Sequence, residues 1–149
     1  MHGLEPIFDK RRVRTFFVKS IKNFELWSGG SMQKPDCLFC KIVAGEIPSN
    51  KVYEDERVYA FDDISPMMPV HTLIIPKNHY DNIAADIPDE DLAAMMRAVK
   101  TVAELKNVED SGFRTIINTN DDSCQTVHHV HVHVLGGKQM NDGNPSLSD

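Results

Sequence analysis

Residues 125–137, QTVHHVHVHVLGG, contain four of the seven histidines of this chain. Three of them alternate with β-branched valines, a pattern that favours an extended strand whose successive side chains point to opposite faces. His129, His131 and His133 should therefore share one face, with neighbouring imidazoles about 6.6 Å apart. Imidazole nitrogens can bind a metal or attack phosphorus. We interpret the row as functional, because protonated imidazoles would repel one another on a purely structural face.

A metal site is the first possibility, because Cys37 and Cys40 form a Cys-x-x-Cys pair. Two imidazoles would complete the tetrahedral Cys2His2 arrangement that is typical of structural zinc. Two histidines of the row can tilt toward one metal, but a third would require the strand to bend, so the row should divide its tasks. A redox role for the cysteines is the alternative. With three cysteines in all, we expect a reducing, cytoplasmic compartment and no disulfide framework.

Length and composition limit the classes of protein that this chain can belong to. Its 149 residues suffice for one domain with one core. No run approaches the ~20 apolar residues of a membrane span, and no signal-peptide core is visible. The formal net charge of −6 argues against a protein that coats nucleic acid. We therefore expect neither a membrane nor a nucleic acid as partner.

Residues 1–31 differ from the rest in charge, with six lysines and arginines against three acidic residues. They end in a Gly/Ser spacer before Met32, which is typical of a junction between an added leader and a native start. Four apolar residues at three- and four-residue spacing predict a basic amphipathic helix: Val13, Phe17, Ile21 and Phe24. We interpret residues 1–31 as an engineered or vector-derived leader, with a native regulatory or targeting arm as the alternative, and residues 32–149 as the domain.

The domain reads as α+β. A short helix or turn is expected in residues 37–48, and two strands in residues 51–64 are joined by the acidic turn Glu54-Asp55-Glu56. A third strand in residues 71–80 should stop at Pro76, and one long amphipathic helix should follow Pro88 and span residues 89–105. Residues 113–120 and 127–135 give a fourth and a fifth strand.

The motifs CLFCKI, GEIPS, VYEDERVYAFDDISP, HTLIIPKNH and INTNDDSCQTVHHVHVHVLGGKQM follow one another in register over residues 36–140. Together they resemble the histidine triad nucleotide-binding proteins, and among these the purine nucleoside phosphoramidases. The resemblance implies a five-stranded antiparallel sheet with one long and one short helix, and a homodimer that pairs two such sheets. It also implies a purine nucleotide substrate and hydrolysis of phosphoramidates or nucleotidyl adducts through a nucleotidyl-histidine intermediate. A nucleotide-binding or sensing module with incidental turnover is the alternative.

The same resemblance implies a role for each polar residue. His131 is the expected nucleophile, and His71 matches the fourth histidine of the family. Asp63 should accept hydrogen bonds from both ribose hydroxyls. The phosphate contacts are expected from His133, Asn118, Gln125 and Thr126. The hydroxyl of Thr126 could also protonate the leaving group. The expected base pocket consists of Phe39, Ile42, Phe61 and Ile64, for which plain core packing is an equal alternative.

The resemblance also completes the metal site. In family members that keep the cysteine pair, zinc is held by the histidine after IIPKN, here His79, and by the first histidine of the triad, here His129. The crowded row then divides into three tasks: His129 holds structural zinc, His131 attacks and His133 binds phosphate. His128 remains on the valine face. Cys124 departs from the glycine that close relatives often have at its position.

The leader interpretation predicts that a chain beginning at Met32 keeps the fold and the turnover, because every residue with an assigned chemical role lies beyond Asp36. Circular dichroism and a phosphoramidate hydrolysis assay on the full and shortened chains measure both properties. Loss of activity in the shortened chain would show that residues 1–31 belong to the domain.

Overall fold

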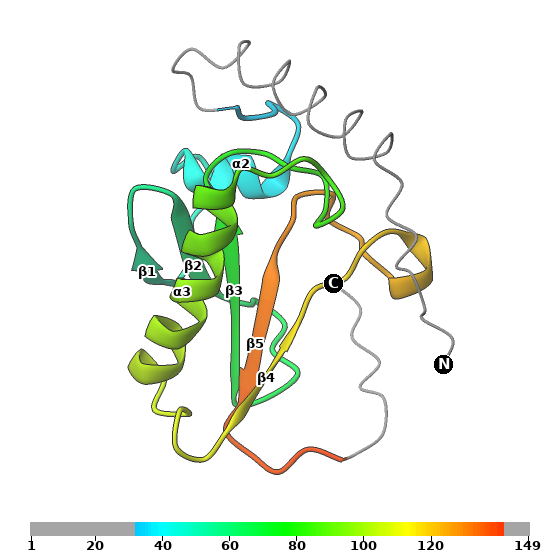
Figure 1. Cartoon of the computed structure of the whole chain (residues 1–149). Coiled ribbons are helices and arrows are strands. Elements are labelled where there is room, and N and C mark those ends of the chain that lie inside the picture. The colour runs from blue at the N-terminus through cyan, green and yellow to red at the C-terminus, as the bar shows by residue number, and fades with distance from the viewer. Residues whose placement is uncertain (1–31, 142–149) are drawn as a thin grey trace, which may run out of the picture. The chain divides into compact units, whose positions relative to one another are not determined.

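The computed structural model describes residues 32–141, and the predicted leader lies outside the described residues. The elements are the short helix α2 (Leu38–Val43), the strands β1 (Lys51–Glu54), β2 (Val58–Asp62) and β3 (Val70–Pro76), the long helix α3 (Asp89–Leu105), the strand β4 (Phe113–Ile116), the 3-10 turn η1 (Asp121–Ser123) and the strand β5 (Val132–Gly136) (Figure 1). None of the helices in this part of the chain is long and apolar enough to cross a membrane.

The strands form one antiparallel sheet in the order β1-β2-β3-β5-β4. This confirms the predicted α+β fold with a five-stranded sheet, one short helix and one long helix. The strand β5 lies between β3 and β4, although α3 and β4 separate it from β3 along the chain. The histidine row is therefore carried into the middle of the sheet, where both neighbouring strands can position it.

One face of the sheet is covered by α3. Ala60, Ile74 and Val132 are cross-strand neighbours on this face. They pack against apolar side chains of the helix, among them the fully buried Met95 and Val102. Figure 1 shows α3 lying along this side of the sheet. The valines of the histidine row belong to this core, which explains why they alternate with the histidines.

The opposite face carries the polar chemistry. Phe61, Leu73 and His133 are cross-strand neighbours there. A second, smaller apolar cluster joins Phe61 and Leu73 to Phe39 and Ile42 of α2. The sheet therefore separates a dry core under α3 from a face where apolar residues stand beside histidines.

The strand β5 begins at Val132, five residues later than predicted from the alternation. The reason lies in β3. The register pairs Ile74 with Val132, so it would place Val130 opposite Pro76. Proline has no N–H to donate to a ladder. The N–H of Val130 instead donates to the carbonyl of Tyr80 at 2.7 Å.

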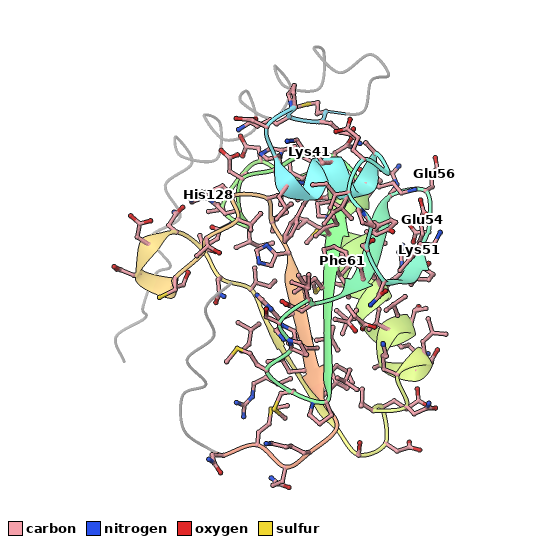
Figure 2. All side chains as sticks on the ribbon, turned by 180° about the vertical axis from the view of Figure 1, so that it is seen from behind. Lys41, Lys51, Glu54, Glu56, Phe61 and His128 are labelled. Atoms are coloured by element: carbon pink, nitrogen blue, oxygen red, sulfur yellow. The ribbon has the colours of Figure 1, made fainter. Side chains whose placement is uncertain are left out.

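The end of β4 and the position of His128 also differ from the predictions. The strand β4 ends at Ile116, so the predicted residues 117–120 lie in the loop before η1. The alternation does not extend back to His128, which is exposed and not on the valine face (Figure 2). The side chains of the histidine row are thus supplied partly by strand and partly by the irregular segment before it.

A buried carboxylate anchors the first turn of α3. Asp91 is 1% exposed and accepts hydrogen bonds from the Tyr80 hydroxyl at 2.6 Å, from Arg57 at 2.9 Å and from Asn78 at 3.3 Å. Burial, followed by this hydrogen bond, raises the pKa of Tyr80 well above its ordinary value. Asp91 therefore ties the helix to the loop after β3, which is the loop that carries His79.

Asp91→Ala should lower the free energy of unfolding by about 2–3 kcal/mol, because it leaves a buried tyrosine hydroxyl without its acceptor. Asp89→Ala, in the same helical turn but exposed, is the matched control and should change stability by less than about 0.5 kcal/mol. Urea unfolding of both variants measures the difference. Equal losses would mean that the effect comes from the charge at the helix terminus and not from the buried hydrogen bonds.

Candidate functional site

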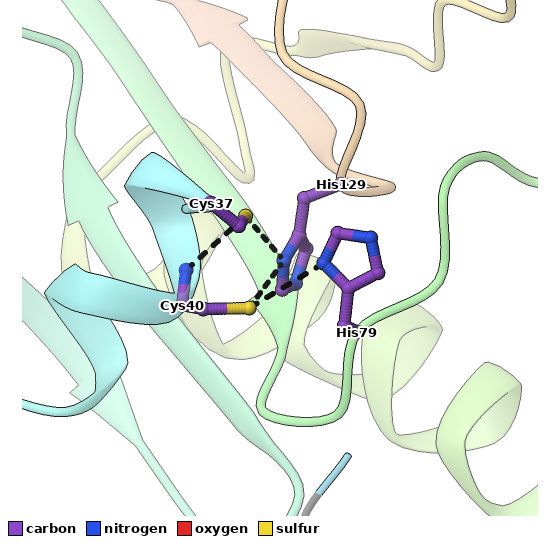
Figure 3. Close-up of side chains that lie close together, drawn as sticks. All are labelled: Cys37, Cys40, His79 and His129. Atoms are coloured by element: carbon purple, nitrogen blue, oxygen red, sulfur yellow. Dashed lines mark hydrogen bonds between the residues drawn. The ribbon is translucent and has the colours of Figure 1, made fainter. Parts of the chain in front are cut away.

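The four predicted zinc ligands come together where three chain segments meet (Figure 3). Cys37 and Cys40 lie at the start of α2, His79 follows β3, and His129 precedes β5. The Nδ1 atom of His129 lies 3.4 Å from the Cys37 sulfur and 3.5 Å from the Cys40 sulfur. The Nδ1 atom of His79 lies 3.4 Å from the Cys40 sulfur. All four ligand atoms lie within 4.8 Å of one another.

These distances fit a single zinc ion. Tetrahedral coordination, with zinc–sulfur bonds of about 2.3 Å and zinc–nitrogen bonds of about 2.0–2.1 Å, separates sulfur from nitrogen by about 3.5 Å. The observed sulfur–nitrogen distances of 3.4–3.5 Å match this value. The donor set of two thiols and two imidazoles is also one that zinc prefers.

The outer nitrogens of both imidazoles are held by oxygen acceptors. The Nε2 atom of His79 donates to Asp81 at 2.8 Å, and that of His129 donates to the carbonyl of Pro76 at 2.8 Å. Each proton is thus fixed at Nε2, and each Nδ1 lone pair faces the sulfurs. Such partners orient metal-binding histidines and select their tautomer. Four side chains from distant parts of the sequence therefore present their lone pairs to one point.

Burial keeps two of these groups neutral in the protein alone. It raises the pKa of the Cys40 thiol to about 11 and lowers the pKa of the His129 imidazole to about 4. The neutral imidazole is the form that binds a metal. The thiol must lose its proton on binding, so occupancy by zinc would be accompanied by proton release.

Asp81 and Lys34 were not singled out from the sequence, although both support this cluster. Asp81 accepts from His79 and from the Lys34 ammonium, and these two hydrogen bonds, in that order, lower the pKa of Asp81. The backbone N–H of Lys34 donates to the Cys40 sulfur at 3.4 Å. A carboxylate two residues after a ligating histidine is the signal that could have identified Asp81.

His131 is held by the backbone of its own segment. Its Nδ1 atom lies 2.7 Å from the carbonyl oxygen of His129 and must therefore donate to it. The proton is then at Nδ1 and the lone pair at Nε2. The His131 ring meets the edge of Phe39, with centroids 5.1 Å apart, and lies 5.0 Å from the ring of His133. The imidazole is thus fixed in the tautomer that a nucleophile needs.

His133 receives the opposite tautomer. The backbone N–H of Met67 donates to Nδ1 of His71 at 3.1 Å, so the proton of His71 is at Nε2. That proton is donated to Nδ1 of His133 at 2.9 Å. The proton of His133 must then be at Nε2. Two neighbouring imidazoles thus differ, because His131 offers a lone pair at the atom where His133 carries a proton.

Asp63, His71 and His133 also lie close enough together to be tested as a second metal site. Asp63 approaches Nε2 of His71 to 3.5 Å. A metal at that nitrogen would displace its proton while Nδ1 still accepts from Met67, which would leave a deprotonated imidazole ring. The hydrogen bonds of His71 therefore argue against a metal at this place and in favour of a hydrogen-bonded pair of His71 and His133.

The predicted base pocket is only partly assembled. Phe39, Ile42 and Phe61 are buried in one cluster, and the ring centroids of Phe39 and Phe61 are 5.6 Å apart in an edge-to-face arrangement. Ile64 is 98% exposed and is not a member of that buried cluster. Phe39, which lies between the two cysteine ligands in the sequence, was predicted as a base contact. Its ring also packs edge-to-face with the rings of His129 and His131.

The three remaining predicted residues lie on the loop between β4 and β5. Asn118 and Gln125 are buried, and Thr126 is exposed. The amide N–H groups of Gln125 donate to the carbonyls of Asp81 and Val127. Both N–H groups of this amide are therefore directed at main-chain oxygens, and we propose a role for Gln125 below.

The antiparallel sheet, the Cys2His2 cluster and the neighbouring histidines together describe a small α+β protein with a histidine-lined site. Residues 44–140 match the HIT domain family, and the chain belongs to that family.

Relatives of similar sequence agree with this membership. Protein HitA of Neisseria gonorrhoeae is 44% identical over 103 residues, which cover 68% of this chain and 95% of that protein. A 14 kDa zinc-binding protein of Brassica juncea is 44% identical over 111 residues, which cover 71% of this chain and 96% of that protein. The adenylylsulfatase HINT1 of Arabidopsis thaliana is 42% identical, with 70% of this chain and 73% of that protein covered.

Solved structures show the same fold. A histidine triad protein from Clostridium difficile superposes with a TM-score of 0.71 at 44% identity, covering 76% of this chain and all of that one. A HIT family hydrolase from Legionella pneumophila gives a TM-score of 0.67 at 44% identity, with 72% and 97% of the two chains covered.

We expect the purified protein to contain about one zinc per chain, and Cys40→Ser to lose it, because the serine hydroxyl is a poor zinc ligand. The melting temperature should fall by on the order of 10 °C or more, since structural zinc contributes directly to folding. Cys124→Ser, at an exposed cysteine outside the cluster, is the matched control and should keep both properties. Elemental analysis and calorimetry measure them. Full zinc content in Cys40→Ser would disprove the ligand set.

Proposed function

We propose that this protein hydrolyses purine nucleoside phosphoramidates or related nucleotidyl adducts at the α-phosphorus, through a nucleotidyl-histidine intermediate. The observation that carries the proposal is the pair of opposite tautomers at His131 and His133. A nucleophile needs a lone pair, and a developing oxyanion needs a hydrogen-bond donor. The two rings, 5.0 Å apart, supply one of each.

In the first step, Nε2 of His131 forms a bond to phosphorus and the bond to the leaving group breaks. The ring becomes positively charged, and the carbonyl of His129, already bound at 2.7 Å to the Nδ1 proton, stabilises that charge. The Nε2 proton of His133 is directed to a non-bridging oxygen. Thr126 is our choice for donating a proton to the leaving amine. In the second step, water attacks phosphorus and returns a proton to Thr126, and the bond to His131 breaks, which restores the neutral imidazole.

Substrate binding uses the surrounding groups. We assign Asp63 to the ribose hydroxyls, because one of its oxygens is held by the N–H of Ser65 at 2.8 Å and the other faces the histidine pair. Asn118 joins the phosphate contacts, and Phe39, Ile42 and Phe61 are assigned to the purine. The exposed Ile64 would be the outer edge of that pocket.

The relatives support the reaction class. One relative is named an adenylylsulfatase and one structural neighbour a HIT family hydrolase, and these names support hydrolysis of an adenylyl compound as the reaction class. An adenylyl sulfate and an adenylyl amine differ only in the group that leaves. The alternative, a nucleotide-binding module with incidental turnover, predicts binding without rapid hydrolysis.

Zinc, a homodimer and a cytoplasmic location belong to the same proposal. Two relatives are named zinc-binding proteins. When bound by Cys37, Cys40, His79 and His129, zinc would supply a structural cross-link and no reacting group. The strand β4 is one of the two outer strands of the sheet, and Phe113 on it is 38% exposed, which makes this edge our choice for pairing two subunits.

His131→Ala should lower kcat for adenosine phosphoramidate on the order of a thousandfold or more, because it removes the attacking atom. AMP should still bind, since Asp63, Asn118 and the apolar pocket are unchanged. His128→Ala, an exposed histidine outside the site, is the matched control. Steady-state kinetics and AMP titration measure both effects. If the wild-type protein binds AMP but turns over no faster than His131→Ala, the enzyme proposal fails and the binding alternative stands.

The intermediate can be trapped separately. Rapid quenching without acid should give a nucleotidyl adduct on His131, since a phosphorus–nitrogen bond is labile in acid, and mass spectrometry locates it. An adduct on His129 or His133 would overturn the assignment of roles. Overall inversion at a chiral phosphorus would exclude the two-step route.

A further inference from the structure

Gln125 is 4% exposed, and both the nitrogen and the oxygen of its amide are hydrogen-bonded to backbone groups. Its Nε2 atom donates to the carbonyl of Asp81 at 2.8 Å and to the carbonyl of Val127 at 3.0 Å. Its Oε1 atom accepts from the N–H of Asn120 at 2.9 Å. An amide has two hydrogens to donate, and both are directed at main-chain oxygens. Gln125 is therefore placed to hold chain segments together and not to donate to a phosphate.

The segments that it joins carry the two halves of the site. Asp81 lies two residues after the zinc ligand His79, and Val127 lies two residues before His129. The carbonyl of His129 in turn holds the Nδ1 proton of His131 at 2.7 Å. A short path thus leads from the segment after β3, through the Gln125 amide, to the backbone that fixes the nucleophile.

Two other contacts join the same segments. The N–H of Val130 donates to the carbonyl of Tyr80 at 2.7 Å, and the amide of Asn82 donates to Asn120 at 3.2 Å. The second of these is exposed and can be replaced by water. The Gln125 amide is the buried side-chain contact among the three. Its loss leaves the carbonyl of Asp81 without this donor, whereas the carbonyl of Val127 still accepts from the N–H of His129 at 2.9 Å.

We propose that Gln125 is a positioning residue that ties the zinc-ligand segment, residues 79–82, to the loop leading into the histidine row. This role rests on the proposed function for its effect on catalysis, although the connection itself does not. When the amide is removed, the loop and the His129 carbonyl can shift relative to His79. A displacement of about 1 Å at the nucleophile can cost on the order of a hundredfold in rate, whereas AMP binding through Asp63 and the apolar pocket is little changed.

Gln125→Met tests this role, because methionine keeps the length and adds no charge but cannot donate or accept in the same way. Ser123→Ala is the matched control. It removes the acceptor for the Thr119 N–H at 2.6 Å and the donor to the Asn120 carbonyl at 3.0 Å within the same loop, but it leaves the Gln125 contacts to Asp81 and Val127 in place. Three quantities are measured on the zinc-loaded proteins: kcat at saturating adenosine phosphoramidate, the Kd of AMP, and the rate at which zinc is released to a chromogenic chelator.

For Gln125→Met we expect kcat to fall about 10- to 100-fold and the Kd of AMP to stay within about threefold. Zinc release should accelerate by about tenfold, which corresponds to the loss of about one hydrogen bond. Ser123→Ala should match the wild type in all three.

Two results would overturn the proposal. One is a Kd of AMP raised about tenfold with kcat unchanged, which would make Gln125 a direct phosphate contact. The other is zinc release at the wild-type rate, which would show that the bridge does not support the zinc-ligand segment. If the wild type itself shows no turnover, the proposed function fails, and zinc release alone then decides the role of Gln125.

Discussion

The convergence of two thiols and two imidazoles is the constraint on which the rest of the site depends. Four ligand atoms from three segments lie within 4.8 Å of one another. Groups of this polarity are costly to bury unless they share a partner. When the four ligands are together, His79 and His129 are held side by side, although they are 50 positions apart in the chain. The strand β5, which carries His133, then starts at Val132, after the position opposite Pro76. The reactive face of the sheet is thus built outward from the cluster.

The roles of the histidines are decided by backbone groups within reach of each ring. His131 and His133 are chemically identical residues two positions apart. The carbonyl of His129 makes one a lone-pair donor at Nε2, and the N–H of Met67, acting through His71, makes the other a proton donor there. Spacing alone could not assign these tautomers, because they depend on what the other ring nitrogen contacts.

Most of the fold could be predicted from local patterns, whereas the residues of the site were proposed from the resemblance to the family. The helix over residues 89–105 has a strong apolar stripe with an acidic first turn, and the structure gives the same limits. The start of β5 could not be predicted from its own sequence, because the alternation continues upstream and the interruption comes from Pro76 on a different strand. That interruption is useful. A carbonyl in the ladder of a central strand is paired with a neighbouring strand, whereas the carbonyl of His129 is able to hold His131.

Where the sequence analysis and the structure differ, the residues concerned make contacts with distant parts of the chain. Gln125 and Asp81 lie far apart in the chain, and the local sequence around either residue does not show that the two segments are in contact. Ile64 was grouped with three apolar residues by resemblance, yet its side chain is exposed and theirs are buried. Composition and spacing identify which residue types are present, but burial and hydrogen-bond partners are properties of the folded chain.

The shortness of α2 has a consequence for how this domain loosens. A helix of six residues has almost no stability of its own in water, because nucleation costs more than so few hydrogen bonds return. It stays helical through what its side chains contact: the thiols of Cys37 and Cys40 at the cluster, and Phe39 and Ile42 in the apolar group. Opening of the helix, exposure of that apolar group and separation of the four ligands are therefore one local unfolding event. Any such opening also moves the ring of Phe39 away from His131, while the larger core under α3 remains folded.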